Sequence, residues 1–600
     1  MSNPRRWSRL PLVVLLILYV ALAVWYSVTI PLGEAPDEVP HFTYVRYLAQ
    51  HGRLPTTEEE HEAFQPPLYY ALGAALTFGI QDESEAPFAV RANAHFDVED
   101  PRAPKNLLLH SADEAWPYRG WALAWHLVRM VSIVLGVVTV WAVYELGRVI
   151  FPTRQVIPIT MAALTAFTPQ FLFMTAVVNN DNAAVAFSAL VLWQTAALLH
   201  ERKRARLWKR SLLLGFVLGL GLLSKANLIA LVPTVGLGIL VSTWRRKELA
   251  TRDRLLLAAG CLLLTFGLAA IISGWYFVRN WTFHGDPMGW AFLLEINARR
   301  EGPLTLDVLY WLFKGIFRSF WLGWIGIAFE DLIYWIIGIL SLVGAVGFVL
   351  WLVCRWRMLG VAARWTLALL GLHVVITLVS LLQWTATVLG TDQGRLIYPL
   401  LPTVMLVLAA GWAWLVRGAA QRWVLGGLVA GMLTLALVTP IRYIGPVHAP
   451  ARAATEWELA TATPLGVDWG SVRLLAYSLG SREVEPGDKL VLDLYWEALE
   501  PLDQDLMALV QLVDQEGKFL MYADGSPSAG RDTTDRWRPG IPLASHHLLP
   551  VPDYGQPGEY HLTISLYPFG ESTWLPASGP EGALLGDHLV LPETVWIVGP

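Results

Sequence analysis

This chain has few cysteines and few charged residues for its length. Only Cys261 and Cys354 are present among its 600 residues, and both precede residue 441, so the C-terminal part contains no disulfide bond. Charged residues make up 16% of the chain and hydrophobic residues 55%, whereas soluble proteins carry about 25% charged residues. Together with a mean hydropathy of +0.45, this composition excludes an ordinary soluble protein and predicts a polytopic membrane protein.

Apolar stretches long enough to cross a bilayer, about 20 residues each, recur along the first 440 residues. We predict an α-helical transmembrane domain over residues 1–440 with about eleven membrane-spanning helices. The expected spans lie near residues 10–30, 121–148, 156–178, 182–200, 210–224, 226–243, 254–278, 332–354, 362–384, 395–416 and 422–440. Arg129 falls inside the second of these spans and has no evident partner in the sequence.

The distribution of Lys and Arg predicts which loops face the cytoplasm. The N-terminus carries three arginines within its first nine residues, and the segment 200–210 holds six basic residues against one acidic residue. Such loops stay on the cytoplasmic side. In contrast, segment 31–120 holds fifteen acidic and six basic residues, which suits a large extracytoplasmic loop. The N-terminus is therefore expected inside, and the end of the chain outside.

A second extracytoplasmic loop is expected over residues 279–331. Its segment 305–330 is aromatic and apolar but contains Lys314 and Arg318. If this segment crossed the membrane, the basic residues near 355–364 would face outward, against the charge rule. We therefore predict an interfacial or re-entrant helix at the outer surface.

The pattern of the chain changes near residue 441. Beyond it, apolar and polar residues alternate in short runs, for example at 489–495 and 559–566, and each run follows a Pro-Gly turn. Alternation between turn signals is typical of half-buried β-strands. We predict an extracytoplasmic β-sandwich domain over residues 441–600.

Polar residues cluster in the segments predicted to lie at the outer surface. Asp37, Glu38 and His41 directly follow the first span, and Pro36 and Pro40 flank the acidic pair. The other candidates are Tyr69 in a Pro-Pro-Leu-Tyr-Tyr segment, Asp181 in an Asn-rich turn, Lys225, Arg279, Arg395 and Tyr398. Isolated cations beside carboxylates can bind the phosphate of an anionic lipid while a carboxylate removes a proton from an acceptor.

The order of these motifs resembles that of the GT-C membrane glycosyltransferases. The motifs are an acidic pair after the first span, Pro-Pro-Leu-Tyr, a lysine between short spans, Arg-Asn followed by Gly-Asp-Pro, and Arg395-x-x-x-Pro-x-x-Pro402. More narrowly, residues 10–440 are similar to bacterial relatives of the protein O-mannosyltransferases and of the aminoarabinose transferase of lipid A, including DUF2142-type proteins. The segment Ser319–Gly326 also resembles the last group.

The resemblance implies transfer of a sugar, usually with inversion, from a polyprenyl-phosphate carrier to a lipid, glycan or protein acceptor. It makes Asp37 the candidate general base and Arg395 the first candidate for binding the donor phosphate, with Lys225 and Arg279 as second candidates. Glu38 would shape the site, hold acceptor hydroxyls or help bind a metal. The remaining substrate-binding candidates are His41, Tyr69, Asp181 and Tyr398.

Some relatives use a divalent metal ion, and the metal requirement here stays open. The candidate ligands are Glu38, His41 and Asp181, which would have to converge in space. Nothing in the sequence indicates a nucleic-acid partner, and the expected partners are the bilayer, the lipid-linked donor and the acceptor.

Other interpretations remain open for both the residues and the protein. Asp37 and Glu38 could cap a surface helix, Asp181 and Asp286 could be turn residues, and Lys225 could extend toward the membrane surface. The protein could also be a transporter or flippase, although transporters place charges at the membrane midplane and show repeats. A third alternative is a membrane-anchored glycan-binding protein whose working part is the β-domain.

Overall fold

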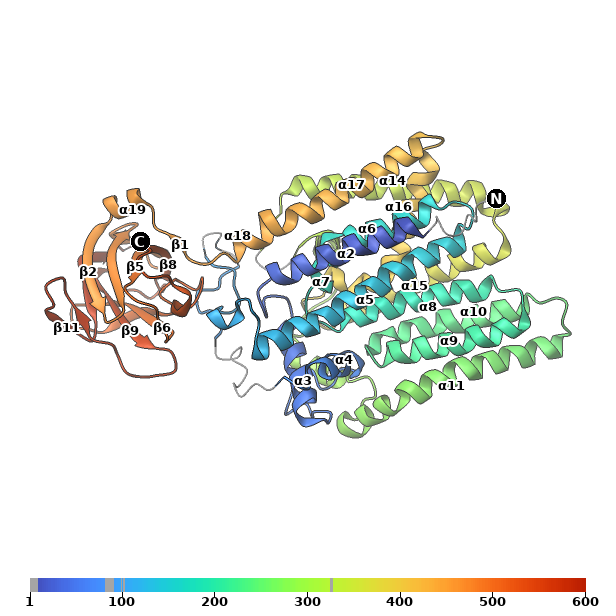
Figure 1. The fold of residues 1–600 in the computed structure, drawn as a ribbon, viewed down its shortest axis with the longest axis horizontal. Helices are drawn as coiled ribbons and strands as arrows, with labels where there is room; N and C mark the ends of the chain where they lie inside the picture. Colours follow the sequence, from blue (N-terminus) through green and yellow to red (C-terminus); the bar gives the residue numbers. More distant parts are fainter. Residues whose placement is uncertain are drawn as a thin grey trace.

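The computed structural model describes residues 9–80, 91–98, 100, 103–323, 327 and 329–599. Two of the three N-terminal arginines and the end of the Ser319–Gly326 segment lie outside these residues. Figure 1 shows a bundle of roughly parallel helices with a β-domain at one end. The helices α3 and α4 lie at that same end, whereas the N-terminus lies at the opposite end of the bundle.

Nine helices in the described residues are long and apolar enough to cross a membrane, and a bent pair makes a tenth candidate. The pair is α6 (Val156–Phe167) and α7 (Pro169–Thr175), which meet at 63°. The nine are α2 (Leu10–Thr29), α5 (Gly120–Ile150), α8 (Asp181–Leu199), η3 with α10 (Ala226–Trp244), α11 (Thr251–His284), α14 (Asp331–Arg355) with η4, α15 (Val361–Thr385), η5 with α16 (Gly394–Leu415), and α17 (Ala420–Thr439) with its extension to Val447.

The one remaining predicted span, residues 210–224, corresponds to α9 (Arg204–Leu222), which packs between α8 and α11. Its first two turns carry four basic residues, so its apolar part is shorter than that of the other spans. A polytopic helical membrane domain, as predicted, is confirmed. The orientation of the termini relative to the bilayer stays a prediction.

The helix predicted at the membrane surface is α13 (Leu306–Trp321). The Thr305 side chain accepts a hydrogen bond from the Val308 amide and caps its first turn. Leu312 and Ile316 are buried against the bundle, while Leu306 on the same helix is exposed. At 16 residues, the helix is about 24 Å long, which is shorter than a hydrocarbon core of about 30 Å.

The C-terminal region forms two sheets that share one core, as expected for a β-sandwich. Trp469 and Trp496 from one sheet and Leu562 from the other are buried in that core. One sheet has the order β1-β8-β5-β3-β2-β10-β11 and the other β4-β12-β9-β6-β7. The strands are β1 (Arg452–Ala453), β2 (Thr463–Trp469), β3 (Val472–Leu479), β4 (Glu483–Val484), β5 (Lys489–Ala498), β6 (Leu506–Val513), β7 (Phe519–Gly525), β8 (Leu543–Pro550), β9 (Gly558–Pro568), β10 (Ala577–Ser578), β11 (Leu584–Gly586) and β12 (Leu589–Ile597).

Candidate functional site

Asp37 precedes α3 (Glu38–His51) in an unusual backbone conformation. Its φ of 61° and ψ of 9° lie in the left-handed region, which non-glycine residues seldom adopt. In the described part of the chain, only Ala529 is another non-glycine residue with positive φ. Backbone strain of this kind persists where the surrounding structure enforces it and is common at functional sites. The turn thus fixes the direction in which the Asp37 carboxylate points.

An alternating chain of charges begins at this carboxylate. Nη2 of Arg395 donates to Oδ2 of Asp37, and Nη1 of Arg395 lies 3.8 Å from Oδ2 of Asp181. Nζ of Lys225 donates to the other oxygen of Asp181 and also to Oδ1 of Asn180, at 3.3 Å. The structure therefore brings together four residues that the sequence predicted as site residues. They come from the turn before α3, from η5 (Gly394–Leu400), from α8 and from the turn before η3 (Ala226–Leu231).

These four residues, called the charge chain from here on, differ in solvent exposure. The Asp37 side chain is 48% exposed, whereas those of Arg395, Asp181 and Lys225 are 12%, 10% and 19% exposed. Burial raises the pKa of Asp37, but the positive charge of Arg395 outweighs this effect and holds the pKa below its ordinary value. Asp37 is consequently ionised at neutral pH and accessible to solvent.

Glu38 points the other way, into the protein interior, and is fully buried. Its Oε1 accepts hydrogen bonds from Nε1 of Trp125 at 2.9 Å, Nε of Arg129 at 2.8 Å and the amide of Val178 at 2.8 Å. Its Oε2 accepts from Nη2 of Arg129 at 2.8 Å and the amide of Gly33 at 3.1 Å. These five hydrogen bonds occupy both carboxylate oxygens. Glu38 therefore attaches the beginning of the first loop to α5.

Arg129, which had no evident partner in the sequence, is the counterpart of Glu38. Besides that carboxylate, its guanidinium donates to the carbonyls of Ser27, Ile30 and Pro31 at 2.6 to 2.9 Å. All its N–H groups are thus used, and the chain that leaves α2 is fastened to α5. Sequence reasoning detected the buried charge but not its partner, because 91 residues separate Arg129 from Glu38.

The other predicted substrate-binding side chains are buried, and each has a hydrogen bond within the protein. Nδ1 of His41 pairs with the hydroxyl of Tyr70 at 2.8 Å. The hydroxyl of Tyr69 pairs with Ser132 at 2.8 Å and accepts from the amide of Asn179 at 3.1 Å. In the same way, the Tyr398 hydroxyl donates to the carbonyl of Phe320 at 3.0 Å. In this structure the three hydroxyl or ring groups are thus bonded to the protein itself.

Arg279, the remaining predicted cation, forms no ion pair with the charge chain in the part of the protein that the structure describes. Its Nη2 donates to the carbonyl of Pro55 at 2.6 Å, and its guanidinium lies over the rings of Tyr276 and Phe283. It therefore ties the first loop to the end of α11. Its Nη1 is buried and has no hydrogen-bond partner among the described residues.

Two further acidic residues close to Asp37 were not selected from the sequence. Glu62 lies between α3 and α4 (Leu68–Thr77), is buried, and acts electrostatically on both His41 and Asp37. It belongs to the acidic run Glu58–Glu62, which looks like an ordinary solvated surface segment. Glu34, three residues before Asp37, is buried as well.

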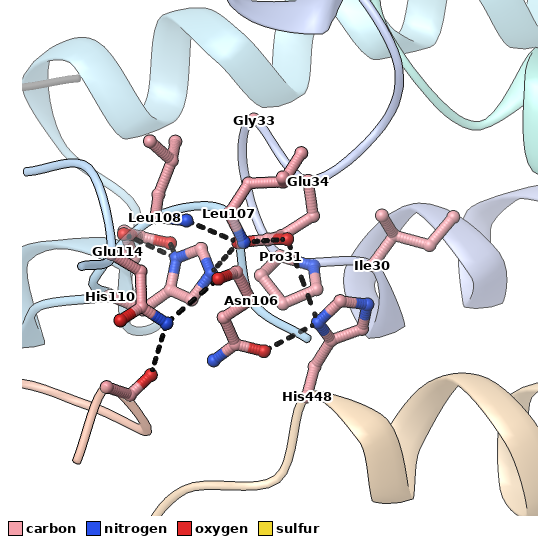
Figure 2. Close-up of polar contacts among 12 residues, drawn as sticks. Ile30, Pro31, Gly33, Glu34, Asn106, Leu107, Leu108, His110, Glu114 and His448 are labelled. Carbon is pink, nitrogen blue, oxygen red and sulfur yellow. Dashed lines mark hydrogen bonds and ion pairs between the residues drawn. The ribbon is translucent and has the colours of Figure 1, made fainter. Parts of the chain in front are cut away.

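Glu34 lies where the first loop meets the segment that leads into the β-domain (Figure 2). Its carboxylate accepts hydrogen bonds from the amides of Leu107 and Leu108 at 2.8 and 3.0 Å and pairs with Nε2 of His110 at 2.9 Å. Nδ1 of His448, just after α18 (Gly445–Val447), lies 4.0 Å from the same carboxylate. The three residues Glu34, His110 and His448 are called the junction cluster below.

The junction cluster is held against the β-domain by backbone contacts. Oγ1 of Thr533 donates to the carbonyl of His110 at 3.0 Å, and Nδ2 of Asn106 donates to the carbonyl of Arg531 at 3.2 Å. Burial lowers the pKa of His110, but the charges of Glu114 and Glu34 raise it to about 9. His110 is therefore protonated at neutral pH, when it bridges two carboxylates.

The predicted metal ligands do not converge. Among the residues that the structure describes, no three His, Cys, Asp or Glu side chains form a group able to hold a metal ion. Glu38 uses both oxygens in the bonds to Arg129 and its neighbours, and His41 bonds Tyr70. In this arrangement Glu38, His41 and Asp181 therefore do not form a common set of metal ligands.

Residues 125–272 match the family model described as dolichyl-phosphate-mannose-protein mannosyltransferase. This match confirms, for part of the chain, the resemblance that the motifs predicted. It covers α5 to α11 for the most part and includes Asp181 and Lys225. No curated protein sequence matches the chain.

Several solved structures are similar to this chain at low sequence identity. The protein O-mannosyltransferase Pmt1-Pmt2 complex of S. cerevisiae bound to its sugar donor is 16% identical, with 53% of this chain and 37% of that chain covered and a TM-score of 0.31. ArnT from Cupriavidus metallidurans bound to undecaprenyl phosphate is 15% identical, with coverages of 73% and 66% and a TM-score of 0.41. Arabinosyltransferase EmbB from Mycobacterium smegmatis is 11% identical, with coverages of 98% and 65% and a TM-score of 0.37. The chain thus spans little more than a third of the length of the yeast protein.

Proposed function

We propose that this protein is a membrane glycosyltransferase that transfers a sugar from a polyprenyl-phosphate-linked donor to a hydroxyl of an extracytoplasmic acceptor. The observation that carries the proposal is the charge chain of Asp37, Arg395, Asp181 and Lys225. It offers an exposed, ionised carboxylate directly beside cations that suit a phosphate. The family match over residues 125–272 supports the same class of reaction.

In the proposed reaction, the acceptor oxygen attacks the anomeric carbon of the sugar while the bond from that carbon to the phosphate oxygen breaks. Asp37 takes the proton of the acceptor hydroxyl. The polyprenyl phosphate leaves with the electron pair of the broken bond, and Arg395 and Lys225 stabilise the negative charge that it gains. Attack from the face opposite the leaving group inverts the anomeric configuration.

The pairing of Arg395 with Asp37 links donor binding to the strength of the base. Without donor, Arg395 lowers the pKa of Asp37, which makes the carboxylate a weak base. A donor phosphate that binds Arg395 competes for the same guanidinium and offsets its charge, so the pKa of Asp37 rises toward its ordinary value. The carboxylate thus becomes a stronger base when the donor is in place.

The test is a transfer assay with purified protein and a panel of polyprenyl-phosphate-linked sugars that includes mannose and arabinose donors. Wild-type protein should release polyprenyl phosphate in the presence of its donor, and Asp37→Asn should abolish this release. Glu58→Gln is the matched control, because Glu58 is an exposed carboxylate on the same loop. Full activity of the Asp37→Asn variant would remove Asp37 as the base, and no turnover of any donor by wild type would reject the proposed function.

A further inference from the structure

The Glu62 carboxylate has one buried oxygen without a hydrogen-bond partner. The side chain is 9% exposed, and its Oε1 makes only a long contact of 3.4 Å with Nδ1 of His61. Its Oε2 is buried and has no partner among the described residues. A buried carboxylate oxygen normally accepts at least one hydrogen bond, so this oxygen is a free acceptor.

Glu62 is also held in a fixed position by the residues that follow it. The carbonyl of Ala63 accepts a hydrogen bond from the hydroxyl of Tyr276 at 3.3 Å, and the carbonyl of Phe64 accepts one from Nδ2 of Asn280, also at 3.3 Å. Both donors are buried side chains on α11. The backbone next to Glu62 is therefore anchored on a rigid element, as a preorganised binding group requires.

The same segment is tied to the charge chain from the other side. Oε1 of Gln65 accepts a hydrogen bond from Nδ2 of Asn180 at 3.2 Å, and Oδ1 of Asn180 accepts from Lys225. Glu62 interacts electrostatically with His41, Asp37 and Arg395. Its free oxygen thus lies in the region of the proposed base and the proposed phosphate-binding residues.

A second unpartnered group lies nearby. The hydroxyl of Tyr44 is buried without a partner among the described residues, and Tyr44 interacts electrostatically with Glu62. A hydroxyl group can donate to the carboxylate of Glu62 while it accepts from a neighbouring donor such as Tyr44. This combination suits an alcohol, and it is unfavourable for an anion because of the carboxylate.

We propose that Glu62 forms a hydroxyl-binding subsite beside Asp37, in which Oε2 accepts a hydrogen bond from a sugar hydroxyl of the donor or of the acceptor. The inference rests on the proposed function and adds a substrate contact to it. A hydrogen bond to a charged acceptor is among the stronger ones. The subsite therefore selects substrates with a hydroxyl at the matching position.

The test is the substitution Glu62→Gln, measured in two ways on the full-length protein. Because the free oxygen has no partner in the unliganded protein, the variant should keep or raise the wild-type unfolding temperature. With the donor that wild type turns over, kcat/KM should fall about 10- to 100-fold. Glu34→Gln is the control for unfolding, since Glu34 has several protein partners, and this variant should unfold at a lower temperature.

Binding measurements then show which hydroxyl is recognised. If Glu62→Gln weakens binding of the sugar-loaded carrier but not of bare polyprenyl phosphate, the contact is to the donor sugar. If both bind normally and the KM for the acceptor rises, the contact is to the acceptor. A substrate that lacks the recognised hydroxyl should react equally well with the variant and with wild type.

Two results would overturn the subsite. One is transfer by Glu62→Gln with kcat and both KM values equal to those of wild type. The other is an unfolding temperature lowered as much as in Glu34→Gln, which would make Glu62 a structural carboxylate. In either case wild-type transfer still stands, whereas an inactive wild type would reject the proposed function itself.

Discussion

The adjacent carboxylates Asp37 and Glu38 should respond to neutralisation in opposite ways. The Asp37 side chain is nearly half exposed and makes one ion pair, with Arg395. Exposed pairs contribute about 0–1 kcal/mol to stability. We therefore expect Asp37→Asn to abolish sugar transfer and to leave the unfolding temperature close to that of wild type.

Glu38→Gln should instead destabilise the protein by about 3–5 kcal/mol, the usual cost of removing one partner from a buried ion pair. The carboxylate accepts five hydrogen bonds, two of them from Arg129. A glutamine side chain has one acceptor oxygen, and its NH₂ group would face N–H donors. It would also leave the charge of Arg129 uncompensated in the interior.

The assay is thermal unfolding of both variants and wild type in one detergent, followed by the fluorescence of the 29 tryptophans, with sugar transfer measured on the same samples. Wild-type stability of Glu38→Gln would refute the structural role of the pair. Equal destabilisation by Asp37→Asn and Glu38→Gln would refute the division of roles between the two residues.

Three further outcomes follow from the site and the junction cluster. Arg395→Ala should weaken binding of a polyprenyl-phosphate donor roughly 10- to 100-fold, measured by titration, whereas Arg417→Ala on a basic loop at the other end of the bundle should not; equal effects would move the phosphate elsewhere. A reporter fused after residue 445 should indicate the extracytoplasmic side, and a cytoplasmic signal would contradict the predicted orientation. The pKa of His110 is raised from an ordinary value of 6.5 to about 9, so its contribution to stability is complete below pH 6.5 and is lost as the pH rises through about 9. Proteolysis near residues 440–455 should therefore accelerate over that interval, and a rate independent of pH, or one that falls, would contradict the role of His110. His448, whose pKa is lowered to about 4 chiefly by burial, stays neutral there and does not oppose this change.

The general architecture could be predicted from the sequence because long apolar runs and alternating strands are local patterns. The proximity of Asp37, Arg395, Asp181 and Lys225 also followed from the predicted spans, since each residue lies at the end of one. That inference needed only the order of the spans and the sign of each charge.

The partners of buried charges could not be predicted in this way. Arg129 and Glu38 are 91 residues apart, and no local pattern in either segment identifies the other residue as its partner. Glu62 lies in an acidic run typical of a solvated loop, but the residue after it is hydrogen-bonded to α11, more than 200 residues later. Such contacts depend on how helices pack, which periodicity and composition do not encode.

The junction cluster affects the interpretation of activity measured on a protein that lacks the β-domain. Removing the chain after residue 441 would remove His448, which lies beside Glu34 and His110. Glu34 is only three residues upstream of the strained turn at Asp37. A truncated protein could then lose activity for either of two reasons: a disturbed backbone at the active site, or the loss of a glycan contact made by the β-domain. Point substitutions on the outer strands, which leave the cluster intact, separate these two causes.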